Sequence, residues 1–556
     1  MNRNTESHFS SAPSVNIPRS KFPLRLNVKT SFNIGQLVPL CKPLEILPGD
    51  SLQIKTSKVL RMPALITPIM DNIVFDTYFF FVPNRLVHNH WKNIMGENSE
   101  SAWLPQNTYS VPQVTAPATT GWTQGTIADY FGIPIGVTDI SVNAYPFRGY
   151  ALCVQEWFRS QDVQDPPNIP VDDTTVTGSN GSNYITDLVK GGMPFIVNKL
   201  FDQFTGCTRA PQKGPDVTIP VASLDPLPVV TGDAIDSSVL TGDTLTWSGK
   251  KNNISLSDMY TSLNSDSTAK LQVSSTDSTS NFAYPNNLWA IQSGVASAAS
   301  INELRMAFQI QKLFERDTYG TRYREILANH FSVRSPDARM QIPEYLGGNR
   351  ISLRISQVLQ QSETGTTPQG TPTGVSLTVD SHNDVNKSFV EHGFVLVLGC
   401  ARYAHSYSQG LDPLWSRKDR FDYFWPVLST LGNQAVTNKE IFAQGSSVVD
   451  SDGEIIDDQV FAYQEAWYSY RYQPDMLTSL MRPTASASLD VWHLGDEYAS
   501  LPSFSSSWLQ EDKTNVDRVL SVTSAVTHQI FGDFHFSGSW IRCMPFYSIP
   551  GLIDHH

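Results

Sequence analysis

Residues 300–348, SINELRMAFQIQKLFERDTYGTRYREILANHFSVRSPDARMQIPEYLGG, form the most informative stretch of the sequence. Ser300 and Glu303 have the spacing of a capping box, in which each side chain satisfies a backbone N–H at the start of a helix. Three apolar residues follow at helical spacing on one face: Met306, Ile310 and Leu313. Gly320 interrupts this pattern, and an arginine-rich segment runs from there to the turn sequence Pro-Glu-Tyr-Leu-Gly-Gly. The stretch therefore predicts a capped helix followed by a charged loop.

The composition around this stretch favours strands. The chain has 556 residues, of which 40% are hydrophobic, and its 35 prolines and 34 glycines are scattered along the sequence. Such a chain can bury a sizeable core made of many short strands joined by long loops. The net charge of −13 argues against a protein that wraps nucleic acid with its whole surface, although local contacts with nucleic acid remain compatible with it.

The cysteines and the apolar runs indicate a cytoplasmic origin. Five cysteines lie far apart, without a CxxC pair: Cys41, Cys153, Cys207, Cys400 and Cys543. This pattern predicts buried free thiols from a reducing compartment rather than a disulfide or zinc framework. No apolar run approaches the ~20 residues that span a bilayer, and the first residues lack the apolar segment of a signal peptide. We expect no membrane insertion.

Strand patterns dominate both sides of residues 300–348, the opening stretch. Residues 77–82, Thr-Tyr-Phe-Phe-Phe-Val, form an aromatic run that predicts a strand buried on both faces and ended by Pro83. Residues 392–399 predict a second buried strand, and residues 534–540 alternate apolar and polar side chains. Residues 355–388 are rich in Gly, Thr and Pro and are expected to form a polar loop.

One internal segment differs from the rest in composition. Residues 214–287 contain 22 Ser or Thr and eight Asp, but no Glu or Arg and only three Lys. Small apolar residues persist, and two Thr-Gly-Asp sequences, at 231–233 and 241–243, are typical of hairpin turns between short strands. The segment is expected to project into solvent.

Several short sequence motifs are similar to those of one protein family. These are Pro-Gly-Asp at 48–50, PIMDN at 68–72, YFFFVPNRL at 78–86, APQKG at 210–214 and the opening stretch itself. They resemble the capsid proteins of the Microviridae, the small icosahedral phages with single-stranded DNA, and in particular those of the gokushovirus branch. The family has an Asn-Glu-Trp-Phe-Arg-Asp pattern where this chain has QEWFRSQD at 155–162, a conservative departure. The resemblance covers nearly the whole chain, apart from the 214–287 segment and residues 355–388.

The resemblance implies an all-β-dominated fold, a single eight-stranded antiparallel jelly roll with long, partly helical insertions between strands. Residues 30–214 and 288–556 would form this core. Independently of the resemblance, residues 1–29 carry five cations against a single acid, Glu6, and predict a basic N-terminal arm that is either solvated or lies on DNA or a neighbouring subunit. Residues 215–287 would form a surface insertion that trimerises at the three-fold axes and meets the host receptor. Candidate receptor-facing residues in it are Thr231, Asp233, Asp243 and Trp247.

The implied function is structural. Identical chains would assemble into a T=1 icosahedral shell around circular single-stranded DNA, in the cytoplasm of a host bacterium, as part of the virion. A small basic DNA-binding protein and scaffolding proteins would be its phage partners, and a bacterial receptor its host partner. The resemblance implies neither enzymatic activity nor a cofactor. The alternative is a secreted carbohydrate-binding or glycan-cleaving β-sandwich, against which the missing signal peptide and the cysteine pattern argue.

Arginines and lysines provide the candidate DNA contacts. The candidates are Arg3, Arg19, Lys21 and Arg25 in the N-terminal segment, and Arg322, Arg324, Arg334 and Arg339 in the opening stretch. A guanidinium group suits phosphate oxygens, but it suits carboxylates equally well. Residues 303–354 contain nine Lys or Arg against six Asp or Glu, so we favour ion pairs within or between subunits for this stretch.

No metal site is predicted. His88 and His90 stand two residues apart, but no third ligand is near them in the sequence, so packing or surface roles are favoured. The acidic run from Asp450 to Asp458 contains hard oxygen ligands, but Gly453 stands at the wrong position for a calcium-binding loop of the EF-hand type. We interpret that run as a solvated loop.

Overall fold

The computed structural model describes residues 19–97, 109–215, 217, 301–318, 320–363, 365 and 368–547, together with short strands between residues 229 and 290. It contains two compact units. The main unit comprises residues 1–213 and 315–556, and the insertion unit comprises residues 214–314. The insertion unit thus runs to Phe314, beyond the expected end at residue 287.

The first sheet of the main unit has four antiparallel strands in the order β1-β22-β4-β18. They are β1 (Ser20–Phe32), β4 (Ser51–Arg61), β18 (Thr378–Ser388) and β22 (Ile530–Arg542). β1 pairs with β22 along its whole length, from Ser20 opposite Arg542 to Phe32 opposite Ile530. Two sequence expectations were therefore wrong: residues 20–29, expected in a basic arm, form strand, and residues 378–388, expected in a loop, form the other edge of this sheet.

The second sheet has the order β15-β5-β19-β2, and β3 also pairs with β19. Its strands are β2 (Val38–Pro39), β3 (Leu44–Ile46), β5 (Ile73–Pro83), β15 (Glu344–Ser352) and β19 (Gly393–Tyr403). Phe79 and Phe81 of β5 belong to the core shared with the first sheet, whereas Phe80 and Val82 belong to a second core. The prediction of a strand buried on both faces is confirmed.

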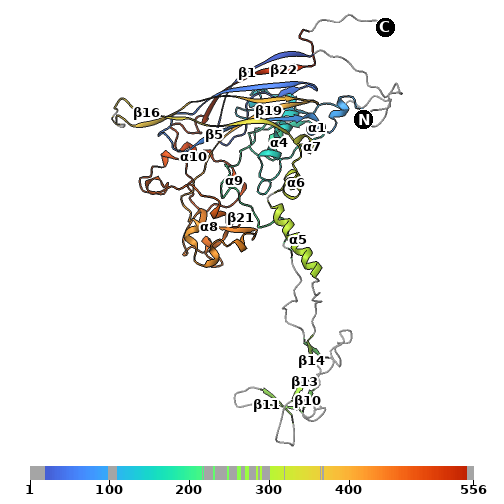
Figure 1. The fold of residues 1–556 in the computed structure, drawn as a ribbon, viewed down its shortest axis with the longest axis vertical. Helices are drawn as coiled ribbons and strands as arrows, with labels where there is room; N and C mark the ends of the chain where they lie inside the picture. The colour runs from blue at the N-terminus through green and yellow to red at the C-terminus, as the bar shows by residue number, and fades with distance from the viewer. Residues whose placement is uncertain are drawn as a thin grey trace, which may run out of the picture. The chain divides into compact units, whose positions relative to one another are not determined.

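Short helices cover the far side of the second sheet. In Figure 1, β1 and β22 lie above β5 and β19, and α4 lies below them. The helices on this side are α1 (Asn84–Val87), α2 (Trp91–Ile94), α3 (Ile127–Tyr130) and α4 (Tyr145–Cys153), which continues as a π-helix over Val154–Phe158. Gly149 lets α4 approach β19, because a Cβ at this position would lie 2.5 Å from Phe394 Cζ. The main unit therefore has three layers.

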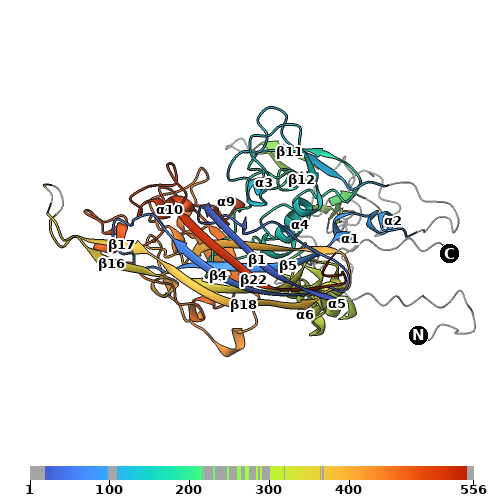
Figure 2. The same ribbon diagram turned by 90° about the horizontal axis from the view of Figure 1, so that it is seen from above.

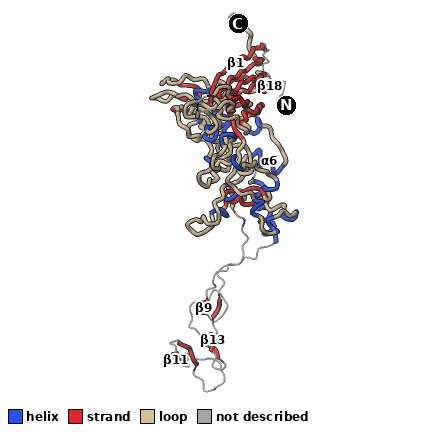
Figure 3. Tube along the Cα trace, turned by 90° about the vertical axis from the view of Figure 1, so that its left-hand side faces the viewer, coloured by secondary structure: helices blue, strands red, loops and turns tan. Residues whose placement is uncertain are grey.

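Loops, drawn in tan in Figure 3, and small sheets fill the rest of the main unit. The further strands are β6 (Gln113–Thr115), β7 (Ser141–Asn143), β8 (Val176–Thr177), β16 (Ile355–Leu359), β17 (Pro372–Ser376), β20 (Asn433–Thr437) and β21 (Val460–Glu465). The further helices are α6 (Tyr323–Phe331), α7 (Asp337–Met340), α8 (Asn438–Ile441), α9 (Ser506–Leu509) and α10 (Lys513–Asp517). A third apolar cluster, which includes Phe204, Val436 and Trp508, holds the loops around β20 and β21 together.

The insertion unit contains three short antiparallel ladders. They join β9 (Val229–Thr231) to β14 (Leu288–Ala290), β10 (Trp247–Gly249) to β13 (Ala283–Pro285), and β11 (Met259–Leu263) to β12 (Ala269–Val273). α5 (Ile301–Asp317) begins in this unit and ends before Gly320, as predicted. Ser300, and the Thr-Gly-Asp turns apart from Thr231, lie outside the described residues. Among the helices that the structure describes, none combines the length and apolar character of a membrane span.

Candidate functional site

The outward face of the first sheet is polar and basic. Figure 2 views the main unit onto this sheet, with β1, β22, β4 and β18 side by side. Alternate residues of β1 and β4 point outward, and five of them are cations: Lys21, Arg25, Lys29, Lys55 and Arg61. The exposed Asp533 of β22 lies opposite Lys29. Five cations against this carboxylate make the face basic in a chain whose net charge is −13.

The register fixes how these cations are spaced. Lys21, Arg25 and Lys29 follow one another at intervals of four residues, about 13 Å along the strand. Arg25 lies opposite Ser537, which in turn lies opposite Lys55, so these two cations are two strands apart, about 10 Å. Among the described residues no ion pair engages the five cations. Their charges are therefore available to an anionic polymer.

The arginines of the opening stretch divide into two groups. Arg322 pairs with Glu325, Nη1 to Oε1 at 3.2 Å, and its Nη2 donates to the carbonyl of Arg159 at 3.0 Å. Arg324 lies over the Trp157 ring, 4.2 Å from its centroid. These two side chains hold the π-helical segment after α4. Arg334 and Arg339 are exposed, as is Arg19 just before β1, whereas Arg3 lies outside the described residues.

The receptor-facing candidates fall in the insertion unit. Thr231 ends β9 opposite Leu288, and Trp247 begins β10 opposite Pro285. Asp233 and Asp243 lie outside the described residues.

A segment at residues 411–431, the aromatic segment, carries many large apolar side chains on the surface. Trp415 is 75% exposed and Val427 is 90% exposed, and Phe421, Tyr423, Phe424 and Trp425 are exposed beside them. Arg417 packs over Tyr470 at 4.2 Å from its ring centroid, so part of the segment is held in place by the main unit. Exposed apolar side chains gathered in one segment are typical of a surface that another molecule covers.

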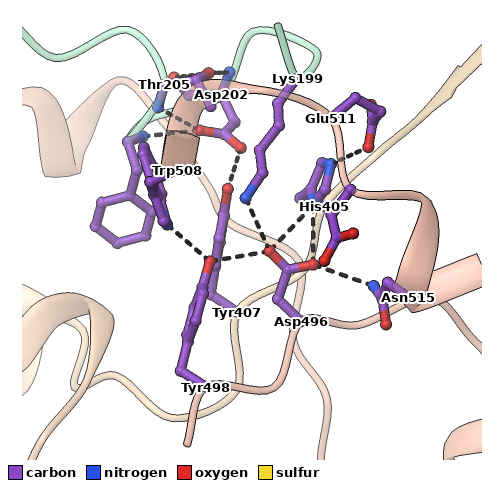
Figure 4. Close-up of polar contacts among 12 residues, drawn as sticks. Lys199, Asp202, Thr205, His405, Tyr407, Asp496, Tyr498, Trp508, Glu511 and Asn515 are labelled. Carbon is purple, nitrogen blue, oxygen red and sulfur yellow. Dashed lines mark hydrogen bonds and ion pairs between the residues drawn. The ribbon is translucent and has the colours of Figure 1, made fainter. Parts of the chain in front are cut away.

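A buried ionic network joins distant parts of the main unit (Figure 4). His405 lies between two carboxylates, 2.9 Å from Asp496 Oδ1 and 2.8 Å from Glu511 Oε1. Lys199 Nζ lies 3.3 Å from Asp496 Oδ2, which also accepts a hydrogen bond from Tyr498 at 3.0 Å. The network thus ties together four segments that are far apart in the sequence.

The pKa values of this network show that it is charged. Burial disfavours the imidazolium of His405, but Asp496 and Glu511 outweigh burial and raise the pKa of His405 to about 9. Burial would raise the pKa of Asp496, but His405 and Lys199 lower it to about 2. His405 and Asp496 are therefore an ion pair at neutral pH, which holds these buried segments together.

The remaining sequence candidates take structural roles. Asp450 accepts hydrogen bonds from the amides of Asp452 and Glu454, at 2.9 and 3.0 Å, and thereby shapes its own loop. All five cysteines are free thiols, and all but the half-buried Cys543 are buried as predicted. Burial raises the pKa of Cys41 to about 12. His88 and His90 meet Asp173, a residue that sequence spacing did not indicate.

Comparison with known proteins agrees with this architecture. The family model described as "Capsid protein (F protein)" matches residues 10–552. This chain belongs to the phage F capsid protein family. The capsid protein is 39% identical over 552 residues to capsid protein VP1 of Spiroplasma virus 4, covering 98% of this chain and 97% of that relative. It is 35% identical to capsid protein VP1 of Chlamydia phage 1, over 592 residues and 98% of each chain.

A third relative is capsid protein VP1 of Bdellovibrio phage phiMH2K, at 35% identity over 99% of this capsid protein and 98% of the relative. The resemblance to the gokushovirus capsid proteins is confirmed, and the capsid protein is a structural component of a virion. This membership sets aside the alternative of a secreted carbohydrate-binding or glycan-cleaving protein.

Proposed function

We propose that the capsid protein assembles into a T=1 icosahedral shell that encloses circular single-stranded DNA, with the insertion unit serving host attachment. Its match to phage capsid proteins over nearly its whole length carries this proposal. A small basic DNA-binding protein and scaffolding proteins would assist assembly, since the chain itself is acidic overall.

The two sheets of the main unit would form a single eight-stranded jelly roll. The strands of the two sheets can be numbered one to eight along the chain if β2 and β3 are counted as one interrupted strand. The first sheet then has the order one, eight, three, six, and the second sheet has the order five, four, seven, two. This order supports a jelly roll, because a double Greek key distributes its strands between two sheets in this way. The small strands that follow β5, β15 and β19 would be insertions into it.

The aromatic segment supports contacts between copies. Burying Trp415 and Val427 against a neighbouring chain would remove apolar area from water, which is the main driving force for association. We expect Trp415→Glu to abolish particles seen by electron microscopy and to leave a sedimenting monomer with an unchanged melting temperature. Trp415→Phe is the matched control and should still assemble. Normal particles from Trp415→Glu would contradict the assignment of this surface.

The basic face of the first sheet would contact the DNA phosphates. Binding of a protein to single-stranded DNA weakens with salt, and each lost phosphate contact reduces the slope of log K against log salt by about 0.7. Lys55→Gln and Arg25→Gln should each reduce that slope for an oligonucleotide bound to the purified chain. Arg339→Gln removes an exposed cation elsewhere and should leave the slope unchanged. If instead Arg339→Gln reduces the slope and the two β-sheet variants do not, the DNA contacts the opening stretch and not this face.

The insertion unit would serve attachment. Deleting residues 220–285 should leave a shell that still forms but does not adsorb to cells, with Thr231, Asp233, Asp243 and Trp247 as receptor-facing candidates. If the deleted chain fails to fold, the segment belongs to the core and this role is wrong.

A further inference from the structure

Two histidines and an aspartate converge at one edge of the helical layer. His88 follows α1, His90 precedes α2, and Asp173 comes from the loop before β8. His88 Nε2 lies 2.6 Å from Asp173 Oδ1, and His90 Nδ1 lies 2.7 Å from Asp173 Oδ2. One ligand atom from each residue lies within 4.8 Å of the others. His88 is fully buried, whereas His90 and Asp173 are 37% and 36% exposed, so solvent reaches the group from one side.

The segments that carry these side chains are clamped together by a buried arginine. Arg148 of α4 donates from Nη1 to the carbonyls of Val87 and Asp172, at 3.0 and 2.8 Å, and from Nη2 to the carbonyl of Thr174 at 3.2 Å. These carbonyls belong to the residue before His88 and to the two neighbours of Asp173. The backbone N–H of Asn89 also donates to Val171 at 2.8 Å. The positions of the three side chains are therefore set before any ligand arrives.

Each histidine ring is also oriented by a neighbour. His88 Nδ1 lies 2.9 Å from the hydroxyl of Tyr145, which can accept or donate, so either tautomer of the ring is satisfied. The ring of His90 stacks on Tyr109 with centroids 4.1 Å apart. In metal sites a hydrogen-bond partner on the second ring nitrogen orients the ligating ring, and Tyr145 takes that place for His88.

We propose that His88 Nε2, His90 Nδ1 and a carboxylate oxygen of Asp173 bind a divalent transition-metal ion of the zinc class. Two imidazoles and one carboxylate form a ligand set that Zn²⁺ accepts, with a water completing the tetrahedron on the exposed side. Neighbouring ligand atoms of a tetrahedral zinc lie about 3.3 Å apart. A small outward movement of Asp173 would therefore admit the ion, as the ring proton of each neutral imidazole moves to its other nitrogen.

The ion would fasten the segment of α1 and α2 to the loop before β8. The charge of Arg148 opposes a cation nearby, but the carboxylate of Asp172 lies 4.0 Å from its Nη2 and offsets it. The competing interpretation is a metal-free arrangement in which both imidazole N–H groups donate to the carboxylate. The two interpretations differ in one measurable property, the affinity of the purified chain for zinc.

The test is a zinc titration of the unassembled full chain by calorimetry, after treatment with a chelator and dialysis. The terminal His555 and His556 are first replaced by alanine, so that they do not contribute a second site. We expect one equivalent of zinc to bind, with an affinity at least tenfold weaker in His90→Ala and in Asp173→Asn. His382→Ala, which removes an exposed histidine 3.3 Å from a different aspartate, is the matched control and should bind zinc normally.

Cobalt provides a second readout. Co²⁺ in the site should show the visible absorption of a tetrahedral complex, and this band should be missing in His90→Ala and Asp173→Asn. Far-ultraviolet circular dichroism of the metal-free variants establishes that they are folded. No zinc binding, or equal affinities in the two site variants and the His382→Ala control, would overturn the proposal and leave the hydrogen-bonded arrangement. The assay needs no particles, so its outcome is independent of the proposed assembly.

Discussion

Replacing His405 by glutamine should destabilise the main unit strongly. The variant removes the imidazolium between Asp496 and Glu511 and leaves both buried carboxylates without their central cation. A pKa raised from 6.5 to about 9 corresponds to about 3 kcal/mol of extra stability for the charged form. Removing one partner of a buried pair costs about 3 to 5 kcal/mol, because the remaining charge is uncompensated. We therefore expect a loss of about 3 kcal/mol at pH 6.

The same interaction predicts how stability depends on pH. The pKa of His405 is higher in the folded chain than in the unfolded chain, so its contribution is fully present below pH 6.5 and is lost as the pH rises through about 9. The natural chain should become less stable across this window. The His405→Gln variant should lack this loss, and the difference between the two chains should shrink as the pH rises.

Urea unfolding of the unassembled chain, followed by tryptophan fluorescence at pH 6, 7.5 and 9, measures this difference. The matched control is His382→Gln on β18, where the histidine is 53% exposed and lies 3.3 Å from Asp380. An exposed pair of this kind contributes about 0 to 1 kcal/mol. If both variants lose the same stability, or if His405→Gln keeps the pH dependence of the natural chain, the buried network is not charged and the reasoning fails.

Three further substitutions, with Val379→Ala as a control, test the packing of the main unit. Asp76→Asn should lower the free energy of unfolding by about 3 kcal/mol in urea titrations, because Asp76 of β5 is buried and pairs with arginines on both neighbouring strands. Phe75→Ala should cost about 3 to 5 kcal/mol through the cavity it leaves in the core, whereas Val379→Ala at an exposed position should change the urea midpoint little. Gly149→Ala should cost about 1 to 3 kcal/mol in the same assay, because its Cβ would collide with Phe394. If Asp76→Asn, Phe75→Ala or Gly149→Ala leaves the urea midpoint unchanged, the packing described around that residue is wrong.

The sequence predicted those elements whose local pattern agrees with their environment. The aromatic run in β5 has apolar side chains on both faces because both faces are buried. α5 was predicted from its helical spacing alone, since Met306, Ile310 and Leu313 on its apolar face are exposed. Most of β1 was missed, because the cations of residues 20–29 suggested a basic arm. Its alternation was nevertheless visible: Leu24 is buried between Lys21 and Arg25, which point outward.

Other features depend on contacts that no local pattern contains. β18 is an edge strand in which only Thr378 and Val385 are buried, so its polar sequence gave no alternating signal. Asp173 contacts His88 and His90 because Arg148 hydrogen-bonds to the backbone of both segments, at Val87 and at Asp172. The spacing of these residues in the sequence does not indicate this contact. The basic face likewise needed the register that brings Lys55 near Arg25.

The position of β22 has a consequence for how the chain is made. This strand, synthesised near the end of translation, lies between β1 and β4, which are synthesised near the beginning. Until residue 542 leaves the ribosome, both early strands keep an open edge, and the sheet cannot close. Closing it joins residues separated by almost the whole chain, which makes folding slow. Products that stop short of β22 lack the strand that joins β1 to β4, so we expect them to be excluded from particles.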